Sequence, residues 1–479
     1  MKVPDLSTIF EQVSNKKIKK LEENNKRLQE ELRIKIKKNN ELKAKIASFE
    51  SRKLSRLLNI YYRKVDESIL FKIFAKIVYI IFFIPIQLLL LLGKDNNVSQ
   101  VNYKSTIKEI SEIISKSNAK KIVFFISPVK WDIPLFQRPQ HIARHMAKEG
   151  VLYFYVVKWE KQQPIKKLYP NLYEVSAINL DLSFIPDVIN IFRSKNFYVS
   201  TYSTDIEDIS DTLRESRRVG GKILYEYVDE IDEKITGGSI PNYVMSRFEE
   251  VVKDEESTYV ITTASKLFED VSFYRKKKFA LITNGVDYSH FHQRFNKNDL
   301  PIQLLKIFKK GKPLIGYYGA LASWMDYDLI KYMAKKRPDY NFLFIGVDYD
   351  GSVIDSNIKD EKNVFVLPPV DYKDLPRYAY FLDVCMIPFQ INEITLSTSP
   401  IKLFEYMALN KPIVTTAMPE CKKYESVLVS DTYQDFIKNL DKALLLKSDK
   451  SYINLLDKEA KENTWESKAK EIIKLIDSE

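Results

Sequence analysis

Cysteine is almost absent from this sequence of 479 residues, which contains only Cys385 and Cys421. Two cysteines cannot build a disulfide framework, and their scarcity favours a reducing compartment. Histidine is also scarce, with four residues, and no group of Cys and His has the spacing of a zinc site. The first residues, MKVPDLSTIF, lack the basic and then apolar layout of a cleavable signal peptide. We therefore expect neither a secreted disulfide-rich protein nor a bound metal.

An excess of positive over negative charge is missing from most of the chain, although the net charge is +11. About 21 Lys and Arg and about 11 Asp and Glu fall in residues 1–100, so about +10 of the charge lies there. A nucleic-acid enzyme needs a basic groove in its folded part, so the near-neutral remainder argues against nucleic acid as a partner. A basic N-terminal region favours an anionic membrane surface. The alternative, a solvated charged helix, explains part of the excess.

Residues 16–50 carry a heptad pattern. Positions spaced alternately by three and four residues form an a/d seam, typical of a left-handed coiled coil: Ile18, Leu21, Asn25, Leu28, Leu32, Lys35, Asn39, Leu42, Ile46 and Phe49. Asn25 and Asn39 fall at a positions and favour a parallel two-stranded register, whereas Lys35 at a d position weakens the middle. We predict that residues 1–50 form a coiled-coil helix that makes a homodimer. The alternative is a single exposed amphipathic helix.

The most apolar stretch, residues 69–92, has a charge-free part that begins only at Ile77 and ends at Leu92. This part is shorter than the roughly 20 residues that span a bilayer, and Pro85 breaks or kinks a helix there. A span would also keep the basic arm in the cytoplasm and export the rest of the chain. We predict that residues 51–100 associate with the cytoplasmic face of the cell membrane, as a peripheral or monotopic segment. A single span is the second alternative, and a buried core helix the third.

Two sets of short β-rich runs alternate with helical runs after about residue 118. The first set is 120–127, 151–157, 196–203, 222–229, 258–264 and 279–284; the second is 313–319, 341–346, 364–369, 384–389 and 412–416. This alternation predicts an α/β protein with parallel sheets, and the length predicts two domains. We predict doubly wound Rossmann-like domains over residues 118–295 and 312–462, a linker over 293–312 and a closing helix over 463–479. A ligand cleft is expected between the carboxyl ends of the two sheets.

The segment SPIKLFEYMA, residues 399–408, has the features of an anion-binding helix tip. Pro400 suits the first turn of a helix, where free amides and the helix dipole attract negative charge. Lys402 adds a positive charge for phosphate, and Glu405 on the same helix face can accept hydrogen bonds from two ribose hydroxyls. These groups suit a nucleoside diphosphate that leaves with negative charge. An ordinary amphipathic helix has the same spacing and is the alternative.

This segment resembles the donor-binding helix of the GT-B glycosyltransferases, in particular the bacterial teichuronic acid and surface polysaccharide branch. Other motifs of that branch follow in its order: Trp131 with QRPQH at 137–141, YVDE at 227–230, TAS at 263–265, NGVD at 284–287, and GYYGA at 316–320 with Trp324 and Asp326. The resemblance covers roughly residues 120–420. It implies the two-Rossmann GT-B fold and transfer of a sugar from a UDP-, GDP- or dTDP-sugar to a lipid-linked or polysaccharide acceptor in cell-surface glycan synthesis. No tightly bound cofactor is expected.

The resemblance also implies residue roles. Lys402 would hold the phosphates, Glu405 the ribose, and Gly319 would let the donor approach the backbone; Thr395, Ser397, Ser399 and Tyr318 would complete the donor site. Asp229, Glu230 and His141 are the candidate catalytic residues, and Trp131, Arg138, Trp324, Asp326 and Asn284 are the candidate acceptor or cleft residues. A packing role for His141 and a solvated strand end for Asp229 and Glu230 are the alternatives.

Two departures from the family pattern affect the predicted mechanism. Ser397 stands where many members have the first carboxylate of an E-x7-E motif, and Ala322-Ser323-Trp324 stands where an arginine is frequent. Retention of anomeric configuration is the expected outcome.

Two other functions remain as alternatives. One is a nucleotide-sugar 2-epimerase of the same fold, which would not need residues 69–92. The other is a non-catalytic scaffold of a polysaccharide-assembly complex, which would not need Lys402 and Glu405.

Overall fold

The computed structural model describes residues 96–133, 136–158, 164–177, 182–206, 208–231, 239–308 and 311–478. The predicted coiled coil and nearly all of the predicted membrane-associating segment lie outside these residues. The chain divides into two units, Met1–Asn96 and Asn97–Glu479, and the description below concerns the second unit. Within the described ranges, no helix is long and apolar enough to cross a membrane.

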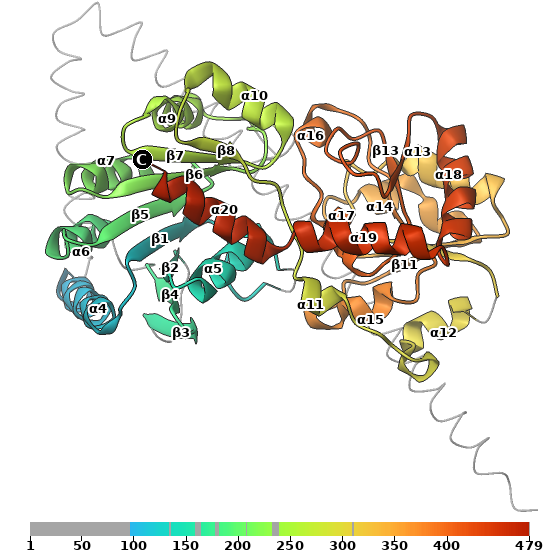
Figure 1. Ribbon diagram of the computed structural model, residues 1–479, viewed down its shortest axis with the longest axis horizontal. Coiled ribbons are helices and arrows are strands. Elements are labelled where there is room, and N and C mark those ends of the chain that lie inside the picture. The colour runs from blue at the N-terminus through green and yellow to red at the C-terminus, as the bar shows by residue number, and fades with distance from the viewer. Residues whose placement is uncertain are drawn as a thin grey trace, which may run out of the picture. The chain divides into compact units, whose positions relative to one another are not determined.

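The first domain is built on an eight-stranded sheet in the order β3-β4-β2-β1-β5-β6-β7-β8. The pairings are parallel except for the antiparallel pair β3–β4. The strands are β1 (Lys121–Ser127), β2 (Leu152–Val157), β3 (Ile165–Tyr169), β4 (Leu172–Ser176), β5 (Asn196–Thr201), β6 (Lys222–Tyr227), β7 (Thr258–Thr262) and β8 (Phe279–Leu281). Helices flank the sheet (Figure 1): α4 (Asn96–Lys116), α5 (Arg138–Lys148), α6 (Phe184–Ile191), α7 (Ile209–Arg218), α9 (Asn242–Lys253) and α10 (Ser265–Tyr274).

Both faces of this sheet are buried. Along β1, Ile122 and Phe124 point into one hydrophobic core, and Val123 and Phe125 point into another. Successive side chains of a strand lie on opposite faces, so a strand covered by helices on both sides reads as a continuous apolar run. The sequence IVFFI therefore determines a central strand of a parallel sheet.

The second domain has a six-stranded, entirely parallel sheet in the order β11-β10-β9-β12-β13-β14. Its strands are β9 (Leu314–Tyr318), β10 (Asn341–Ile345), β11 (Val364–Leu367), β12 (Val384–Ile387), β13 (Ile413–Thr416) and β14 (Val427–Ser430). The helices from α11 onward are α11 (Tyr288–Phe291), α12 (Ile302–Phe308), α13 (Tyr327–Lys336), α14 (Ser352–Ser356), α15 (Leu375–Ala379), α16 (Glu393–Leu396), α17 (Ile401–Ala408), α18 (Tyr433–Leu446), α19 (Lys450–Glu462) and α20 (Trp465–Asp477). The single-turn 3-10 helices among the described residues are η2 (Lys297–Asp299), η3 (Ile358–Asp360) and η4 (Tyr372–Asp374).

Each predicted β-rich run contains an observed strand, but the sequence does not predict β3, β4 or β14. Strand β3 lies at an edge of its sheet, and its residues Lys166, Lys167 and Tyr169 are largely or partly exposed. A strand with one covered side lacks the apolar run on which the prediction depends. The predicted linker also contains a helix, α12, because Leu304 and Ile307 are buried in the core of the second domain.

The chain passes between the domains twice, and the two crossings pair with each other. Val286 and Thr464 form an isolated parallel bridge; the amide of Val286 donates to Asn463 O at 3.0 Å, and the amide of Trp465 donates to Val286 O at 3.0 Å. A Cβ on Gly285 would lie 2.9 Å from Asn463 O, so glycine allows this close approach. The predicted NGVD motif is therefore one of two paired crossings.

After the second crossing, α20 packs on the first domain. Trp465, Ala469 and Ile472 share a core with residues of α5, and the helix (red in Figure 1) runs beside the first sheet. Trp465 is 1% exposed, and its indole stacks on the imidazole of His141 with ring centroids 4.8 Å apart. The C-terminal helix thus completes the hydrophobic core of the first domain.

Candidate functional site

The tip of α17 carries the two predicted donor-binding residues. Pro400 precedes the helix with an extended backbone (φ −70°, ψ 118°), one residue earlier than the sequence predicts. Within the described residues, the amides of Ile401 and Lys402 have no hydrogen-bond partner, as expected of a first helical turn. Lys402 Nζ lies 3.7 Å from Glu405 Oε2, and the two side chains are 13% and 3% exposed. Both groups therefore lie on one face of the helix.

Several buried polar atoms around this turn have no hydrogen-bond partner in the part of the chain that the structure describes. They are Glu405 Oε2, Tyr318 Oη, Tyr372 Oη and both ring nitrogens of His141. Lys402 Nζ lies 5.7 Å from the centroid of the Tyr318 ring, and the pKa of Tyr318 is raised well above its ordinary value by burial and then by the charge of Glu405. A buried polar atom without a partner costs about 1–3 kcal/mol. Such a group of atoms is expected where a ligand supplies the partners.

Two glycines bring the ends of neighbouring strands close to Lys402. Gly319, after β9, has φ +144°, and a Cβ there would lie 2.7 Å from Tyr317 Oη and 3.2 Å from Lys402 Cε. Gly346, after β10, is tighter, since its Cβ would lie 1.7 Å from Gly319 O. Both glycines are therefore needed for close packing within the protein, and the role of Gly319 in approach of the donor stays a prediction; the sequence does not single out Gly346.

We expect Gly346→Ala to lower the free energy of unfolding by about 2 kcal/mol or more, because the added methyl strikes a backbone oxygen and no rotamer change relieves the clash. Urea denaturation followed by circular dichroism measures the change. The matched control is Gly351→Ala, where φ is +87° but no heavy atom lies within 4 Å. Gly351→Ala should lower the free energy of unfolding only by the backbone strain, about 1 kcal/mol. Equal losses in the two variants would contradict the close packing of Gly346 on Gly319.

Three predicted donor-site hydroxyls are bonded to the protein backbone. Thr395 Oγ1 accepts from the amide of Asn392 at 3.0 Å within the capping box of α16. Ser397 Oγ donates to Ile394 O at 3.0 Å, and Ser399 Oγ accepts from the amide of Asn284 at 3.4 Å. Short polar side chains near helix ends readily bond to nearby backbone. In this structure each hydroxyl has a backbone partner near the α16–α17 turn, and contact of these residues with a donor stays a prediction.

Two further predicted cleft residues, Asp326 and Trp131, make contacts within the protein. Asp326 caps α13 by accepting from the amide of Leu329 at 2.8 Å, and it also accepts from Tyr433 Oη at 2.9 Å. Trp131 is 8% exposed, and its indole packs edge-on against Tyr155 at 5.2 Å in the core of the first domain. The ring of Trp131 is part of a hydrophobic core, which favours a packing role over the predicted role as an acceptor or cleft residue.

Trp324 follows β9 and is only partly buried. Its ring centroid lies 6.0 Å from that of Tyr349, which follows β10 and is 68% exposed. The backbone of Trp324 accepts from the amide of Gln390, which follows β12. Trp324 thus lies beside the carboxyl ends of three strands, and its role as an acceptor or cleft residue stays a prediction.

Arg138 forms a buried ion pair that the sequence analysis does not identify. Its Nε lies 2.7 Å from Glu226 Oε2, and the two side chains are each 4% exposed. Glu226 belongs to β6, where a single carboxylate interrupts a buried run, and this interruption is the sequence signal for a buried partner. Arg138 Nη1 also lies 3.3 Å from Asn284 Oδ1. Both predicted cleft residues are therefore engaged within the protein.

The two predicted carboxylates after β6 differ in their surroundings. Asp229 is exposed to water, yet desolvation by surrounding protein raises its pKa above the ordinary value. Both observations fit a carboxylate that water reaches from one side only, and no described residue is found to pair with it. Glu230 instead lies 2.6 Å from Lys266 Nζ, which also lies 2.9 Å from Glu393 Oε2. Burial lowers the pKa of Lys266, but the hydrogen bonds that Lys266 donates to these two carboxylates raise it overall. Asp229 is thus the better candidate for binding an acceptor hydroxyl, and Glu230 is held in an ion pair.

His141 is completely buried in the first turns of α5, stacked on Trp465 and in edge contact with Tyr372 at 5.5 Å. Burial lowers its pKa well below the ordinary value, so the imidazole is neutral. This environment favours the packing role over the catalytic one.

His145, one turn later, gives the protein a predictable pH dependence. Burial first, and then nearby Lys148, lower its pKa to about 4, and neither ring nitrogen has a partner among the described residues. The unfolded value is about 6.5, so the neutral ring stabilises the fold fully above pH 6.5, and this stabilisation is lost as the pH falls toward 4. Between pH 7 and pH 5 the free energy of unfolding should fall by about 2 kcal/mol from this group alone.

His145→Gln should remove this part of the pH dependence, since glutamine does not titrate. Urea denaturation of the variant and the wild type at pH 7 and pH 5 measures the difference. The same loss in both proteins would contradict the assignment to His145.

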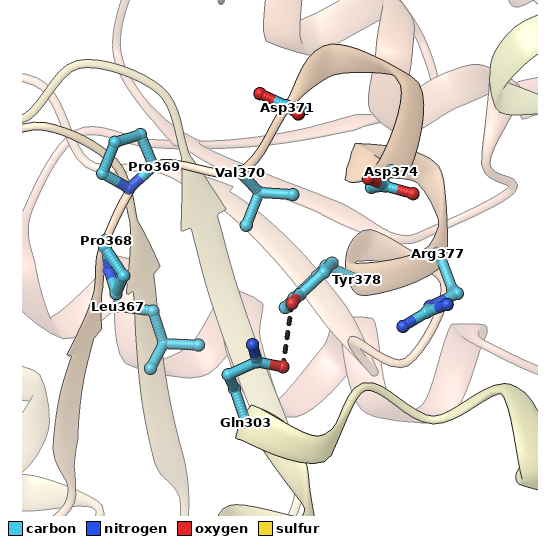
Figure 2. Close-up of a pocket in the computed structure, with 9 residues that line it drawn as sticks. All are labelled: Gln303, Leu367, Pro368, Pro369, Val370, Asp371, Asp374, Arg377 and Tyr378. Carbon is cyan, nitrogen blue, oxygen red and sulfur yellow. Dashed lines mark hydrogen bonds between the residues drawn. The ribbon is translucent and has the colours of Figure 1, made fainter. Parts of the chain in front are cut away.

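Two cavities lie away from the predicted site residues. One, of about 440 Å³, lies beside the end of β11 in the second domain and is lined by Gln303, Leu367, Pro368, Pro369, Val370, Asp371, Asp374, Arg377 and Tyr378 (Figure 2). Tyr378 Oη donates to Gln303 Oε1 at 2.9 Å across it. The other, of about 670 Å³, lies near the start of β1 and includes Lys116, Lys120 and Lys121. The predicted donor-binding side chains line neither cavity.

Comparison with known proteins agrees with this geometry. Residues 312–445, most of the second domain, match the family model of the glycosyl transferases group 1. The provisionally named teichuronic acid biosynthesis glycosyltransferase TuaH of Bacillus subtilis (strain 168) is 27% identical over 205 residues, 42% of this chain and 51% of that protein. The match thus spans about half the length of this relative.

Solved structures share the two-domain fold. HepE of Anabaena in complex with UDP-glucose superimposes with a TM-score of 0.56 and 11% identity over 75% of this chain and all of HepE. WaaG, a glycosyltransferase involved in lipopolysaccharide biosynthesis, gives a TM-score of 0.52 and 13% identity over 74% of this chain and all of WaaG. The predicted resemblance to GT-B glycosyltransferases is confirmed, and the two Rossmann-like domains have the GT-B fold.

Proposed function

We propose that this chain, with its GT-B fold and its second domain of the glycosyl transferases group 1, transfers a sugar from a nucleotide-sugar donor. The observation that supports the proposal best is the turn of α17 on which Lys402 and Glu405 lie together, beside Gly319, with Glu405 Oε2 buried and without a hydrogen bond among the described residues. A cation, free amides and a buried carboxylate acceptor are the groups that a nucleoside diphosphate requires. HepE, which shares the fold, is solved with UDP-glucose.

In this proposal each group acts on a different part of the donor. Lys402 and the amides of Ile401 and Lys402 neutralise the negative charge that develops on the diphosphate as the bond to the sugar breaks. Glu405 accepts hydrogen bonds from the ribose hydroxyls and so fixes the nucleoside. Gly319 lets the phosphates approach the backbone after β9. Asp229 of the first domain, which has no partner among the described residues, is our candidate for binding the acceptor hydroxyl. In a reaction with retention, an oxygen of the departing diphosphate takes the proton of that hydroxyl as the new bond to the sugar forms and the bond to the phosphate breaks.

We further propose a lipid-linked or polysaccharide acceptor in cell-surface glycan synthesis and retention of anomeric configuration. The support is the family match, the similarity to TuaH, and the basic, apolar sequence of residues 51–100. Association of that segment with the cytoplasmic face of the membrane would bring the enzyme close to a lipid-linked acceptor and raise its effective concentration. Dimerisation through residues 1–50 completes the proposal for the N-terminal region.

The test is a thermal-shift screen of the purified full chain against UDP-, GDP-, CDP- and dTDP-sugars, since a ligand that binds only the folded state raises the melting temperature. We expect one nucleotide class to raise it at concentrations well above its Kd. Glu405→Ala should remove this shift. If no nucleotide sugar changes the melting temperature, the proposed donor site is rejected. A non-catalytic scaffold would give this result. A soluble product epimerised at C2 without transfer would indicate the epimerase.

A further inference from the structure

A chain of four buried residues connects the first domain to the tip of α17. Glu226 Oε2 accepts from Arg138 Nε at 2.7 Å, Arg138 Nη1 donates to Asn284 Oδ1 at 3.3 Å, and Asn284 Nδ2 donates to Ser399 O at 2.7 Å. All four residues are at most 7% exposed. The first two belong to β6 and α5 of the first domain, Asn284 lies in a crossing between the domains, and Ser399 directly precedes Pro400. This set is called the Arg138 relay below.

Asn284 is held at both ends of its side chain. Its oxygen accepts from Arg138 and its amide nitrogen donates to Ser399, so the orientation of the side chain is fixed by two different partners. Its backbone amide donates to Ser399 Oγ at 3.4 Å, and Arg138 Nη1 also donates to the neighbouring Thr283 O at 3.0 Å. Two contacts from one residue therefore hold Ser399, three positions before Lys402.

The buried ion pair of Arg138 with Glu226 offers a geometry that apolar side chains do not. A buried ion pair loses hydration, and a pair of apolar side chains of similar size often stabilises a fold equally well. A guanidinium differs from apolar side chains in that its rigid fork can fix several acceptors at once. Here the fork joins a carboxylate of β6 to the backbone and side chain of the crossing segment, and it does so from the first turn of α5.

We propose that the Arg138 relay positions the tip of α17, and so sets where Lys402 and its neighbouring free amides meet the diphosphate. This inference rests on the proposed function for its catalytic consequence, although the positioning itself does not depend on it. Arg138 and Glu226 are thus positioning residues that do not touch the donor, and Asn284 transmits their orientation across the domain boundary.

The test compares the hydrogen–deuterium exchange of residues 399–406 between the wild type and two altered proteins, each as the ligand-free full chain. Asn284→Ala removes the donor to Ser399 O, and Arg138→Gln with Glu226→Gln removes both charges together, so that neither is left buried alone. We expect the amides of Leu403 and Phe404 to exchange at least about tenfold faster in both proteins, because their helical turn loses its anchor. Asn284→Asp keeps an acceptor for Arg138 but loses the donor to Ser399, so it should behave like Asn284→Ala.

Arg275→Lys is the matched control. Arg275 is 1% exposed, lies in the first domain, and donates to the backbone oxygens of Val252, Thr258 and Lys277 of that same domain. This variant should change exchange near β7 and leave residues 399–406 unchanged. Unchanged exchange at 399–406 in both relay proteins would overturn the inference, as would an equal increase in the control.

Donor kinetics separate the inference from the proposed function. If the chain uses a nucleotide sugar, Asn284→Ala should lower kcat/KM for the donor at least about fivefold, because the displaced helix tip no longer places Lys402 and the free amides against the diphosphate. A wild-type protein without donor-dependent activity would reject the proposed function alone, since the exchange result would still stand. Faster exchange with an unchanged KM and kcat would overturn the catalytic consequence of the relay.

Discussion

Replacing Lys402 or Glu405 with alanine should lower turnover at least about tenfold, which corresponds to about 1.4 kcal/mol of lost transition-state stabilisation. Lys402 is the only cation within the first turn of α17, and at 13% exposure its charge is weakly screened by water. Charge on a departing diphosphate grows during the reaction, so the loss should appear mainly in kcat for Lys402→Ala. Glu405→Ala should raise the donor KM as well, because the ribose contact exists before the reaction.

Release of nucleoside diphosphate from the donor measures both effects, with the thermal denaturation of each variant as a check that it is folded. Lys438→Ala is the matched control: Lys438 makes the same i,i+3 ion pair with Asp435, on the exposed side of α18. Its activity should equal that of the wild type. Wild-type rates from both site variants would remove the donor-site assignment, and Glu405→Gln, which keeps an acceptor oxygen without the charge, should retain more activity than Glu405→Ala.

Trp465→Ala should lower the free energy of unfolding by about 3–5 kcal/mol, the range for truncating a buried tryptophan. The ring is 1% exposed and packs on His141, so the variant leaves a cavity between α20 and α5. It also removes the first contact that α20 makes after crossing from the second domain. We therefore expect the loss in the unfolding transition of the first domain, although Trp465 follows the second domain in the sequence.

Urea denaturation followed by circular dichroism measures this loss, and the two domains need to be resolved, since a two-domain chain does not have to unfold in one step. Trp465→Phe should cost less, because a ring remains to stack on His141. Leu445→Ala on α18 is the control: Leu445 is 81% exposed, so its truncation should change stability by less than about 0.5 kcal/mol. A first domain as stable in Trp465→Ala as in the wild type would contradict the packing of α20.

Local sequence patterns determined the two sheets and the candidate donor turn. The apolar runs of the central strands predicted their positions because strands buried on both faces have continuous apolar sequences, as β1 and β9 do. Edge strand β3 was not predicted, because a strand that is not covered on both faces lacks such a continuous apolar sequence. Lys402 and Glu405 were predicted on one face because residues three apart in a helix lie on one side, and this geometry needs no tertiary contact.

The tertiary structure alone decided which polar side chains are available. Thr395, Ser397 and Asp326 have suitable chemistry for a binding site, but their atoms bond to nearby helix ends, and Trp131 packs in a core. The ion pair of Arg138 with Glu226 joins residues 88 positions apart, and the contact of Asn284 with Ser399 joins residues 115 positions apart. A sequence pattern records local periodicity, whereas contacts of this kind arise only when separate elements pack together. The sequence by itself therefore determined the fold class and the candidate donor helix. The packing of the elements decided what holds that helix in place.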